Sequence, residues 1–263
     1  MPELTRPTVT LSYEDTLEGA QAIVFLHGWC DGSPSWATTI ADLQSEYRCI
    51  APDMRGHNKS GRPRDFCYTV EALTNDVVAL CGSLGIARPV IVGHSFGGML
   101  AAVIAGRYPG FARGIVIEDQ PLDFRPFSAQ MRGMEAVIRG AHSHMPFREQ
   151  MLGSMITERM PPESKAMLQS LQESTPPEIG MALWAALFEF TAEEMGALGD
   201  RAMAALAEQP SALIDAQETE GYYATVRTAA PDVQISTLGG GHWVHLEKPV
   251  EFQAALRAFL EAV

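Results

Sequence analysis

The segment Gly93–Gly98, which reads GHSFGG, restricts the fold of this chain more than any other feature. The apolar residues Val90–Val92 before it predict a buried strand, and residues 99–108 after it, MLAAVIAGRY, predict a helix. A G-x-S-x-G segment between a strand and a helix is typical of a sharp turn that holds its serine on strained backbone. The N-terminus of the following helix favours negative charge beside the serine hydroxyl. We therefore expect Ser95 to lie at the centre of an active site.

Short apolar runs alternate with segments of helix length along most of the chain, which predicts a mainly parallel sheet covered by helices. The other runs that we interpret as strands are Ala22–Leu26, Arg48–Ala51, Gly114–Ile117, Ala212–Asp215 and Val233–Leu238. The segment Pro249–Val263 has the amphipathic spacing of a closing helix. With 263 residues, 46% of them apolar, the chain has enough material for one α/β domain with a large core.

The stretch between Leu122 and Glu208 has a different pattern. It contains no strand-like run, two Pro-Pro pairs divide it into helices, and it holds ten of the 13 methionines. We interpret residues 122–208 as a helical cap inserted after the strand Gly114–Ile117, which divides the core into residues 1–121 and 209–263. Methionine-rich helices can form an adaptable apolar wall over an active site, or simply a small core of their own.

Composition argues against several classes of partner and location. The formal charge of −13, from 19 basic and 32 acidic residues, repels nucleic acid and anionic membranes, so we expect neither as a partner. No apolar run reaches the roughly 18 residues of a membrane span, and Met1–Thr10 lacks the features of a secretory signal. The four cysteines fit no metal-binding spacing. We expect a cytoplasmic protein without a bound metal.

The general base is expected near the C-terminus, because the chain order around this type of turn is serine, acid, histidine. His242 follows three glycines, Gly239–Gly241, which permit a tight loop that reaches back to the serine. His245 is interpreted as structural. We expect the oxyanion hole to consist of two backbone N–H groups, those of Phe96 and Trp29.

The acid that orients His242 has several candidates. Its common position follows the late strand, but Thr219 stands where the aspartate is expected there. The alternative position follows the strand before the cap, where Glu118 and Asp119 stand. We predict that Asp119 is the acid, with Glu118 as the second candidate and Glu218 as the third.

Four motifs together resemble the α/β-hydrolase superfamily over essentially the whole chain. They are HGW at 27–29, RGH at 55–57, GHSFGG at 93–98 and GGGHW at 239–243. This resemblance implies an α/β-hydrolase fold, in which an eight-stranded, mainly parallel sheet is flanked by helices and a helical cap follows the sixth strand.

Within this superfamily the chain resembles the cofactor-independent 3-hydroxy-4-oxoquinoline 2,4-dioxygenases. The shared features are Gly28-Trp29-Cys30, an acid after the sixth strand, and Gln217-x-Thr219-Glu220-x-x-Tyr223. The resemblance implies that a His242–Asp119 dyad removes the 3-hydroxyl proton of a quinolone with a 2-alkyl chain. O₂ then adds without any cofactor, and carbon monoxide and an N-acylanthranilate are released. Ser95 would only hydrogen-bond the substrate.

The expected substrate is therefore a small apolar molecule, with O₂ as the second reactant. Three further residues are expected to contact the substrate: His94, Cys30 and Trp184. The alternative function is a serine hydrolase, either a carboxylesterase or a lactonase, that uses a Ser95-Asp119-His242 triad. The resemblance leads us to expect the dioxygenase first. The intact serine, acid and histidine argue against a third possibility, a non-catalytic binding protein.

Overall fold

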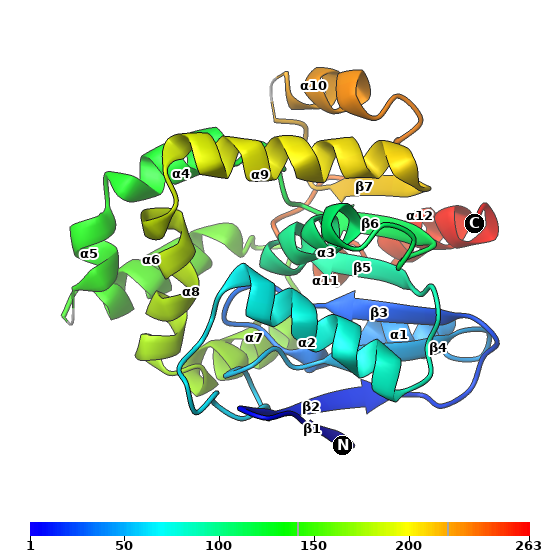
Figure 1. The fold of residues 1–263 in the computed structure, drawn as a ribbon, viewed down its shortest axis with the longest axis horizontal. Helices are drawn as coiled ribbons and strands as arrows, with labels where there is room; N and C mark the ends of the chain where they lie inside the picture. The colour runs from blue at the N-terminus through cyan, green and yellow to red at the C-terminus, as the bar shows by residue number, and fades with distance from the viewer. Residues whose placement is uncertain (141, 220) are drawn as a thin grey trace.

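A twisted sheet runs through the centre of the molecule in the computed structural model, which describes residues 1–140, 142–219 and 221–263 (Figure 1). The eight strands found in these residues follow the order β1-β2-β4-β3-β5-β6-β7-β8. They are β1 (Glu3–Thr5), β2 (Thr10–Asp15), β3 (Ala22–Leu26), β4 (Arg48–Pro52), β5 (Val90–His94), β6 (Gly114–Glu118), β7 (Ser211–Asp215) and β8 (Gln234–Thr237). β2 pairs antiparallel with both of its neighbours, β1 and β4. All neighbouring strands from β4 to β8 in this order pair parallel. The predicted fold class is confirmed.

The six strands marked by apolar runs agree with β3 to β8 within two residues at each end. No strand was predicted for residues 3–15, where β1 and β2 form a hairpin at the sheet edge. This hairpin buries Leu11 and Tyr13 but leaves Glu3 and Glu14 exposed. Because only part of each strand is buried, no apolar run marks it.

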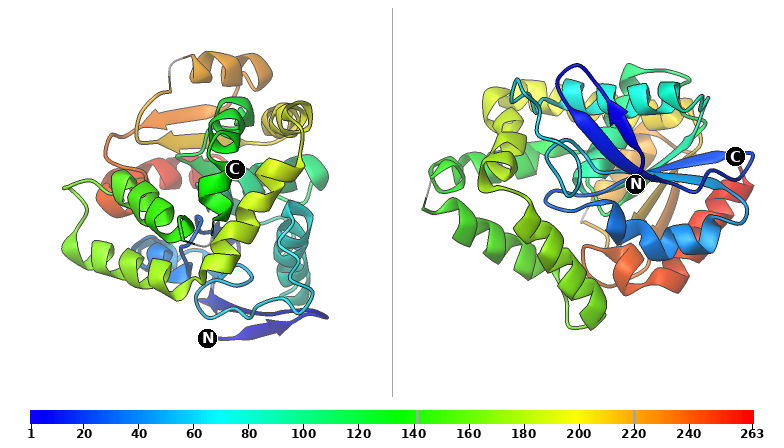
Figure 2. Two further views of the ribbon diagram at one scale, coloured as in Figure 1. Left: turned by 90° about the vertical axis from the view of Figure 1, so that its left-hand side faces the viewer. Right: turned by 90° about the horizontal axis from the view of Figure 1, so that it is seen from below.

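Helices cover both faces of the sheet, which explains why its central strands are apolar throughout. Side chains alternate along β3, so that Ile23 and Phe25 join one buried cluster whereas Val24 and Leu26 join the other. The face with Ile23 and Phe25 is covered by α1 (Ala37–Leu43), α11 (Val244–Glu247) and α12 (Pro249–Glu261) (Figure 2). The second face, with Val24 and Leu26, is covered by α2 (Val70–Ser83) and α3 (Phe96–Arg107). A short 3-10 helix, η1 (Ser33–Trp36), precedes α1, and α10 (Tyr222–Ala229) follows β7.

The elements described between β6 and β7 are all helices, joined by turns and short loops. These helices are α4 (Phe124–Arg132), α5 (Glu135–Arg139), α6 (His144–Met155), α7 (Pro162–Ser174), α8 (Pro177–Glu189), α9 (Ala192–Ala205) and η2 (Leu206–Glu208). Figure 1 shows α5, α6 and α8 beyond the sheet on its left, while α9 runs back above α3. Met131, Met195 and Met203 of this segment join the same buried cluster as α2 and α3. The cap helices therefore continue the core of the second sheet face.

Two kinds of structure are missing from the described ranges. None of their helices combines the length and the apolar character needed to cross a membrane. No three side chains of His, Cys, Asp or Glu are grouped there as a metal ion would require. The cytoplasmic location and the expectation of no cofactor stay predictions.

Candidate active site

Four loops meet below the cap, and each contains a residue with a positive φ. These residues are Cys30 (φ 56°) after β3, Ser95 (φ 51°) after β5, Asp119 (φ 45°) after β6 and Gly240 (φ 103°) after β8. A side chain other than glycine in this region costs of the order of 1–3 kcal/mol, and such strain is concentrated at functional sites. The loops lie at the carboxyl ends of parallel strands, where α/β folds bind their ligands.

Ser95 occupies the turn between β5 and α3, with φ 51° and ψ −121°. Its N–H donates to the carbonyl oxygen of Glu118 at 2.9 Å, which extends the pairing of β5 with β6 by one residue. The neighbouring glycines are required by packing, since a Cβ on Gly97 would lie 2.2 Å from the carbonyl oxygen of Leu26. A Cβ on Gly93 would lie 2.2 Å from the carbonyl oxygen of Gly97. The turn therefore holds the serine against β3 and β6.

The predicted acid and base lie in direct contact. Oδ2 of Asp119 is 2.7 Å from Nδ1 of His242, and their side chains are 21% and 17% exposed. The second oxygen of Asp119, Oδ1, accepts the backbone N–H of Ala216 at 2.9 Å. Because both carboxylate oxygens are held, Asp119 fixes the orientation of the imidazole ring and favours the tautomer with hydrogen on Nδ1. Nε2 of His242 is then free to accept a proton.

A second histidine–carboxylate pair lies beside the first. Glu118 accepts both the backbone N–H and Nδ1 of His245, each at 2.8 Å, and both side chains are completely buried. The ring of His245 is stacked on Trp36 with 4.2 Å between the ring centroids. Glu118 is the last residue of β6, whereas Asp119 follows the strand and has a positive φ, and the two carboxylates bond different histidines. The third candidate acid, Glu218, is exposed on the loop after β7.

His94 supports the base through the backbone of His242, and its contact with the substrate stays a prediction. It borders the cavity but is only 1% exposed, and its Nε2 donates to the backbone oxygen of His242 at 3.0 Å. Burial lowers the pKa of His94 well below its usual range, so the ring is neutral. Asp31 lies 3.9 Å from Nδ1 of His94 and accepts Nε1–H of Trp243 at 3.1 Å.

The first predicted oxyanion donor is oriented by a histidine that accepts one hydrogen bond and donates another. Nε2 of His27 accepts the backbone N–H of Met54 at 2.9 Å, so Nδ1 carries the hydrogen and donates to the carbonyl oxygen of Gly28 at 2.8 Å. In a trans peptide the N–H of the next residue points opposite to that oxygen. The N–H of Trp29 therefore points away from His27.

The second predicted donor belongs to the first residue of α3. The carbonyl oxygen of Ser95 accepts the N–H of Met99 at 3.0 Å, so the N–H of Phe96 points in the opposite direction, away from the helix. In the part of the chain that the structure describes, neither this N–H nor that of Trp29 donates to a protein acceptor. Trp29 and Phe96 line the same cavity as Ser95. Two uncommitted donors are thus available to an oxyanion.

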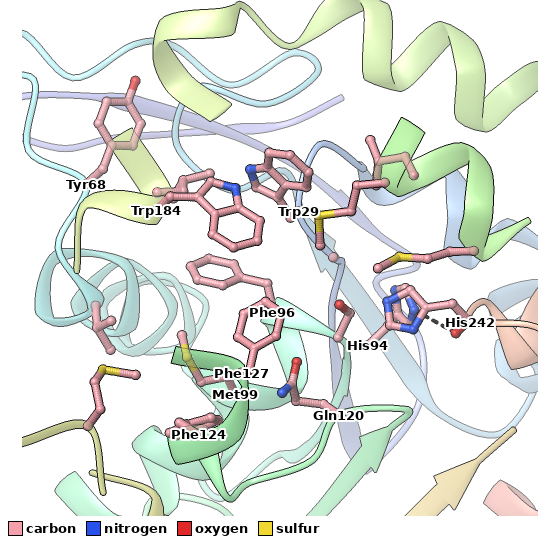
Figure 3. A pocket seen from close by; sticks show the side chains of 18 of the residues that line it. Trp29, Tyr68, His94, Phe96, Met99, Gln120, Phe124, Phe127, Trp184 and His242 are labelled. Carbon is pink, nitrogen blue, oxygen red and sulfur yellow. Dashed lines mark hydrogen bonds between the residues drawn. The ribbon is translucent and has the colours of Figure 1, made fainter. Parts of the chain in front are cut away.

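The cavity bordered by Ser95 and His242 has a volume of about 100 Å³. Its lining is mainly apolar, and Figure 3 shows aromatic side chains such as Trp29, Phe96 and Trp184 around it. Trp184 lies in its wall, with its ring edge-on to Trp29 at a centroid distance of 5.0 Å. Cap residues that line the cavity include Phe124, Phe127, Met151, Leu152, Met155, Leu183 and Met195. Gln120, directly after Asp119, is a polar lining residue that was not predicted. Its position after the predicted acid was the available signal.

Cys30 does not border the cavity, contrary to expectation. Its side chain is 1% exposed and faces Gly180 of α8, where a Cβ would lie 3.6 Å from both Sγ of Cys30 and the ring of Trp29. Burial raises the pKa of the Cys30 thiol to about 12, which keeps it protonated. The positive φ of Cys30 turns the chain so that Trp29, rather than Cys30, covers the cavity.

The Gln217–Tyr223 pattern does not reach the cavity within its described residues. Gln217 and Thr219 are exposed, and Glu220 lies outside the described residues. The hydroxyl of Tyr223 donates to Oδ2 of Asp215 at 3.0 Å and lies 3.1 Å from Oγ1 of Thr237. Burial raises the pKa of Asp215 to about 7. The described residues of this pattern therefore stabilise the ends of β7 and β8. They do not line the cavity, so they offer no contact with a quinolone substrate.

Comparison with known proteins agrees with this architecture. The sequence model of the alpha/beta hydrolase fold matches residues 21–138. The crystal structure of the enol-lactonase from Burkholderia xenovorans LB400 superimposes with a TM-score of 0.78 at 20% identity, covering 99% of this chain and 100% of that chain. The chain has the α/β-hydrolase fold. At this level of identity the superposition shows the fold alone.

Two curated relatives narrow the comparison. Epoxide hydrolase 4 of Mus musculus is 33% identical over 104 residues, which cover 39% of this chain and 29% of the relative. The sn-1-specific diacylglycerol lipase ABHD11 of Mus musculus is 28% identical over 260 residues, covering 91% of this chain and 80% of the lipase. The chain spans less than a third of the length of the first curated relatives that it matches. These comparisons favour the hydrolase alternative and give the expected dioxygenase no support.

Proposed function

We propose that this protein is a serine hydrolase that cleaves a carboxylic ester or lactone. The observation that carries the proposal is the convergence on one cavity of strained Ser95, the His242–Asp119 pair and two uncommitted N–H donors. Acyl transfer through a serine requires this combination of nucleophile, base, orienting acid and oxyanion donors. The hydrolase thus replaces the dioxygenase as the preferred function.

The reaction proceeds in two balanced steps. Oγ of Ser95 attacks the substrate carbonyl carbon while Nε2 of His242 takes the hydroxyl proton, and Asp119 stabilises the imidazolium. The N–H groups of Trp29 and Phe96 stabilise the negative oxygen of the tetrahedral intermediate. The C–O bond to the alcohol breaks, and His242 returns its proton to the alcohol oxygen. Water, deprotonated by His242, then attacks the acyl carbon, the C–Oγ bond to Ser95 breaks, and His242 returns the proton to Oγ as the carboxylic acid leaves.

The chemistry of serine separates this proposal from the activity named for the epoxide hydrolase relative. Attack of Ser95 on an epoxide would open the ring and leave an alkyl ether on the serine. An ether has no carbonyl for water to attack, so the enzyme would stop after one event. A carbonyl substrate instead leaves an ester, which water can hydrolyse. The serine nucleophile therefore favours acyl substrates.

The size of the cavity favours a small acyl group. An engineered protein cavity of about 150 Å³ holds one benzene molecule. The cavity beside Ser95, at about 100 Å³, takes less than that unless flexible side chains such as Met151 and Met155 move. A bicyclic quinolone would require a larger displacement of the cap than a short acyl chain or a small lactone ring. This supports short-chain esters and small lactones as the first substrates to test.

The test combines turnover with covalent labelling. We expect the wild-type protein to hydrolyse p-nitrophenyl acetate or butyrate, or γ-butyrolactone, and to gain one phosphonyl group from a fluorophosphonate at Ser95. The variant Ser95→Ala should lose both, while Ser45→Ala, which changes an exposed serine, should retain both. The proposal is overturned if the wild type is neither labelled nor active on these substrates. Oxygen uptake with a 3-hydroxy-4-quinolone, retained in Ser95→Ala, would restore the dioxygenase.

A further inference from the structure

The cap and the loop that carries His242 share one buried carboxylate. Thr157, just after α6 of the cap, donates its hydroxyl to Oε2 of Glu247 at 2.6 Å. The same oxygen of Glu247 accepts the backbone N–H of Gly241, immediately before His242, at 2.8 Å. The backbone N–H of Thr157 also donates to Oε1 of Glu247 at 3.3 Å. Glu247 therefore joins two segments that are 90 residues apart in the sequence.

Glu247 depends on the cap for most of its hydrogen bonds. The residue is 9% exposed and lies at the end of α11. Two of the three donors that it has among the described residues come from Thr157. The adjacent cation, Lys248, pairs with Glu251 instead. A buried carboxylate without donors is strongly unfavourable, so the charge of Glu247 holds the end of α6 against the histidine loop.

His242 is held from both sides through its own backbone. Its N–H donates to the carbonyl oxygen of Met155 in the cap at 3.3 Å, and its carbonyl oxygen accepts Nε2–H of His94 in the core at 3.0 Å. A Cβ on Gly241 would lie 2.5 Å from Glu247 and 2.7 Å from Thr157. Since this packing leaves no free space, a shift of the cap end would displace His242.

We propose that Thr157 and Glu247 are positioning residues, which use the cap to hold His242 at the geometry required for proton transfer. This inference rests on the proposed hydrolase function. Neither residue lines the cavity among the described residues, so neither is expected to touch the substrate. Their effect is expected on the reaction of Ser95 rather than on substrate binding, because a general base displaced by about 1 Å can lose about 100-fold in rate.

The matched variants are Thr157→Val, which removes the hydroxyl donor at nearly constant volume, and Thr157→Ser, which keeps it. We expect Thr157→Val to lower kcat and the rate of fluorophosphonate labelling by about 10- to 100-fold with little change in KM. Thr157→Ser should keep kcat and the labelling rate close to those of the wild type. Glu247→Gln should resemble Thr157→Val, since it replaces one acceptor oxygen with an N–H₂ donor facing other donors.

A control separates positioning from a general weakening of the cap. Thr191 caps the N-terminus of α9 and lies in the same cap, but its side chain bonds only Glu194 among the described residues. Thr191→Ala should lower the melting temperature and leave kcat and the labelling rate unchanged. Equal effects of Thr191→Ala and Thr157→Val on the rates would overturn the positioning role.

A second measurement does not depend on hydrolysis. Hydrogen exchange should accelerate at the amides of Gly241 and His242 in Thr157→Val and stay unchanged in Thr191→Ala. If the wild type shows neither turnover nor labelling but Thr157→Val still exchanges faster than the wild type at these amides, the contact stands while the proposed function fails. If the wild type is active but Thr157→Val exchanges and is labelled at wild-type rates, this inference is overturned and the proposed function stands.

Discussion

Two histidine–carboxylate pairs stand side by side in this molecule, built from neighbouring residues of the same two segments. Asp119 pairs with His242, and Glu118, one residue earlier, pairs with His245, three residues later. Their closest N–O distances, 2.7 Å and 2.8 Å, are nearly equal. The pairs differ in access, because the side chains of the first are partly exposed whereas those of the second are completely buried.

This difference teaches that pairing by itself does not make a histidine a candidate base. The His242 pair faces a cavity lined by Ser95, Trp29 and Phe96, and the N–H groups of Trp29 and Phe96 have no acceptor among the described residues. The ring of His245 is instead stacked on Trp36, and this pair is buried where no substrate can reach it. We therefore assign chemistry to the first pair and structural support to the second. The predictions below test this division.

The largest effect is expected from the accessible histidine. His242→Ala should reduce ester or lactone turnover by about 10⁴- to 10⁶-fold, because loss of the base removes proton transfer in both steps. Steady-state kinetics measure the loss, and circular dichroism should show an unchanged melting temperature to within a few degrees. Activity within tenfold of the wild type would remove His242 from the mechanism.

Asp119→Asn should reduce kcat by about 10⁴-fold, since an amide favours the wrong imidazole tautomer and no longer stabilises the imidazolium. The matched control is Asp123→Asn, which changes the N-cap of α4 and should alter kcat less than twofold. If Glu118→Gln instead produced the large kinetic loss with intact folding, the assignments of the two pairs would have to be exchanged.

The buried pair is expected to affect stability more than catalysis. Glu118→Ala leaves His245 buried without its acceptor and should lower the free energy of unfolding by about 3–5 kcal/mol. Urea denaturation measures the loss, while active-site titration with fluorophosphonate counts the folded enzyme. The kcat per labelled site should stay within about tenfold of the wild type, because Glu118 touches the reacting groups only through its backbone. A stable but inactive variant would contradict this separation.

A third carboxylate, Asp215, sharpens the comparison, because it is buried like Glu118 but bonds a tyrosine instead of a histidine. Burial raises the pKa of Asp215 to about 7, so the folded state holds more protons than the unfolded state between about pH 4 and pH 7. Stability should fall as pH rises through that window. Asp215→Asn should remove this fall in stability. At pH 8 its free energy of unfolding should be about 1–3 kcal/mol higher than that of the wild type.

Urea denaturation at pH 4 and pH 8 checks the Asp215 prediction. The difference between variant and wild type should be larger at pH 8, because only then is the wild-type carboxylate ionised. Asp232→Asn, at an exposed position, serves as the control and should show no such difference. Equal stability differences for Asp215→Asn at the two pH values would show that burial of Asp215 is not coupled to its protonation.

Local patterns were sufficient for much of the fold and for the centre of the site. The backbone of each segment follows from its own residues. This holds for the apolar run before Gly93, the glycines around Ser95 and the glycines before His242. The position of Asp119 just past the predicted strand Gly114–Ile117 also favoured it over Glu118 as the acid. These features could be predicted because their physical causes lie within a few residues along the chain.

Contacts between distant segments were decided only by the tertiary structure. The sequence by itself determined the strands β3 to β8, the serine turn and the candidate base. The fold turned Cys30 away from the cavity, brought Gln120 into it, and placed Tyr223 against Asp215 rather than against a ligand. It also joined Thr157 to Glu247. Side-chain direction across such separations depends on how helices and strands pack together, which periodicity along one chain does not encode.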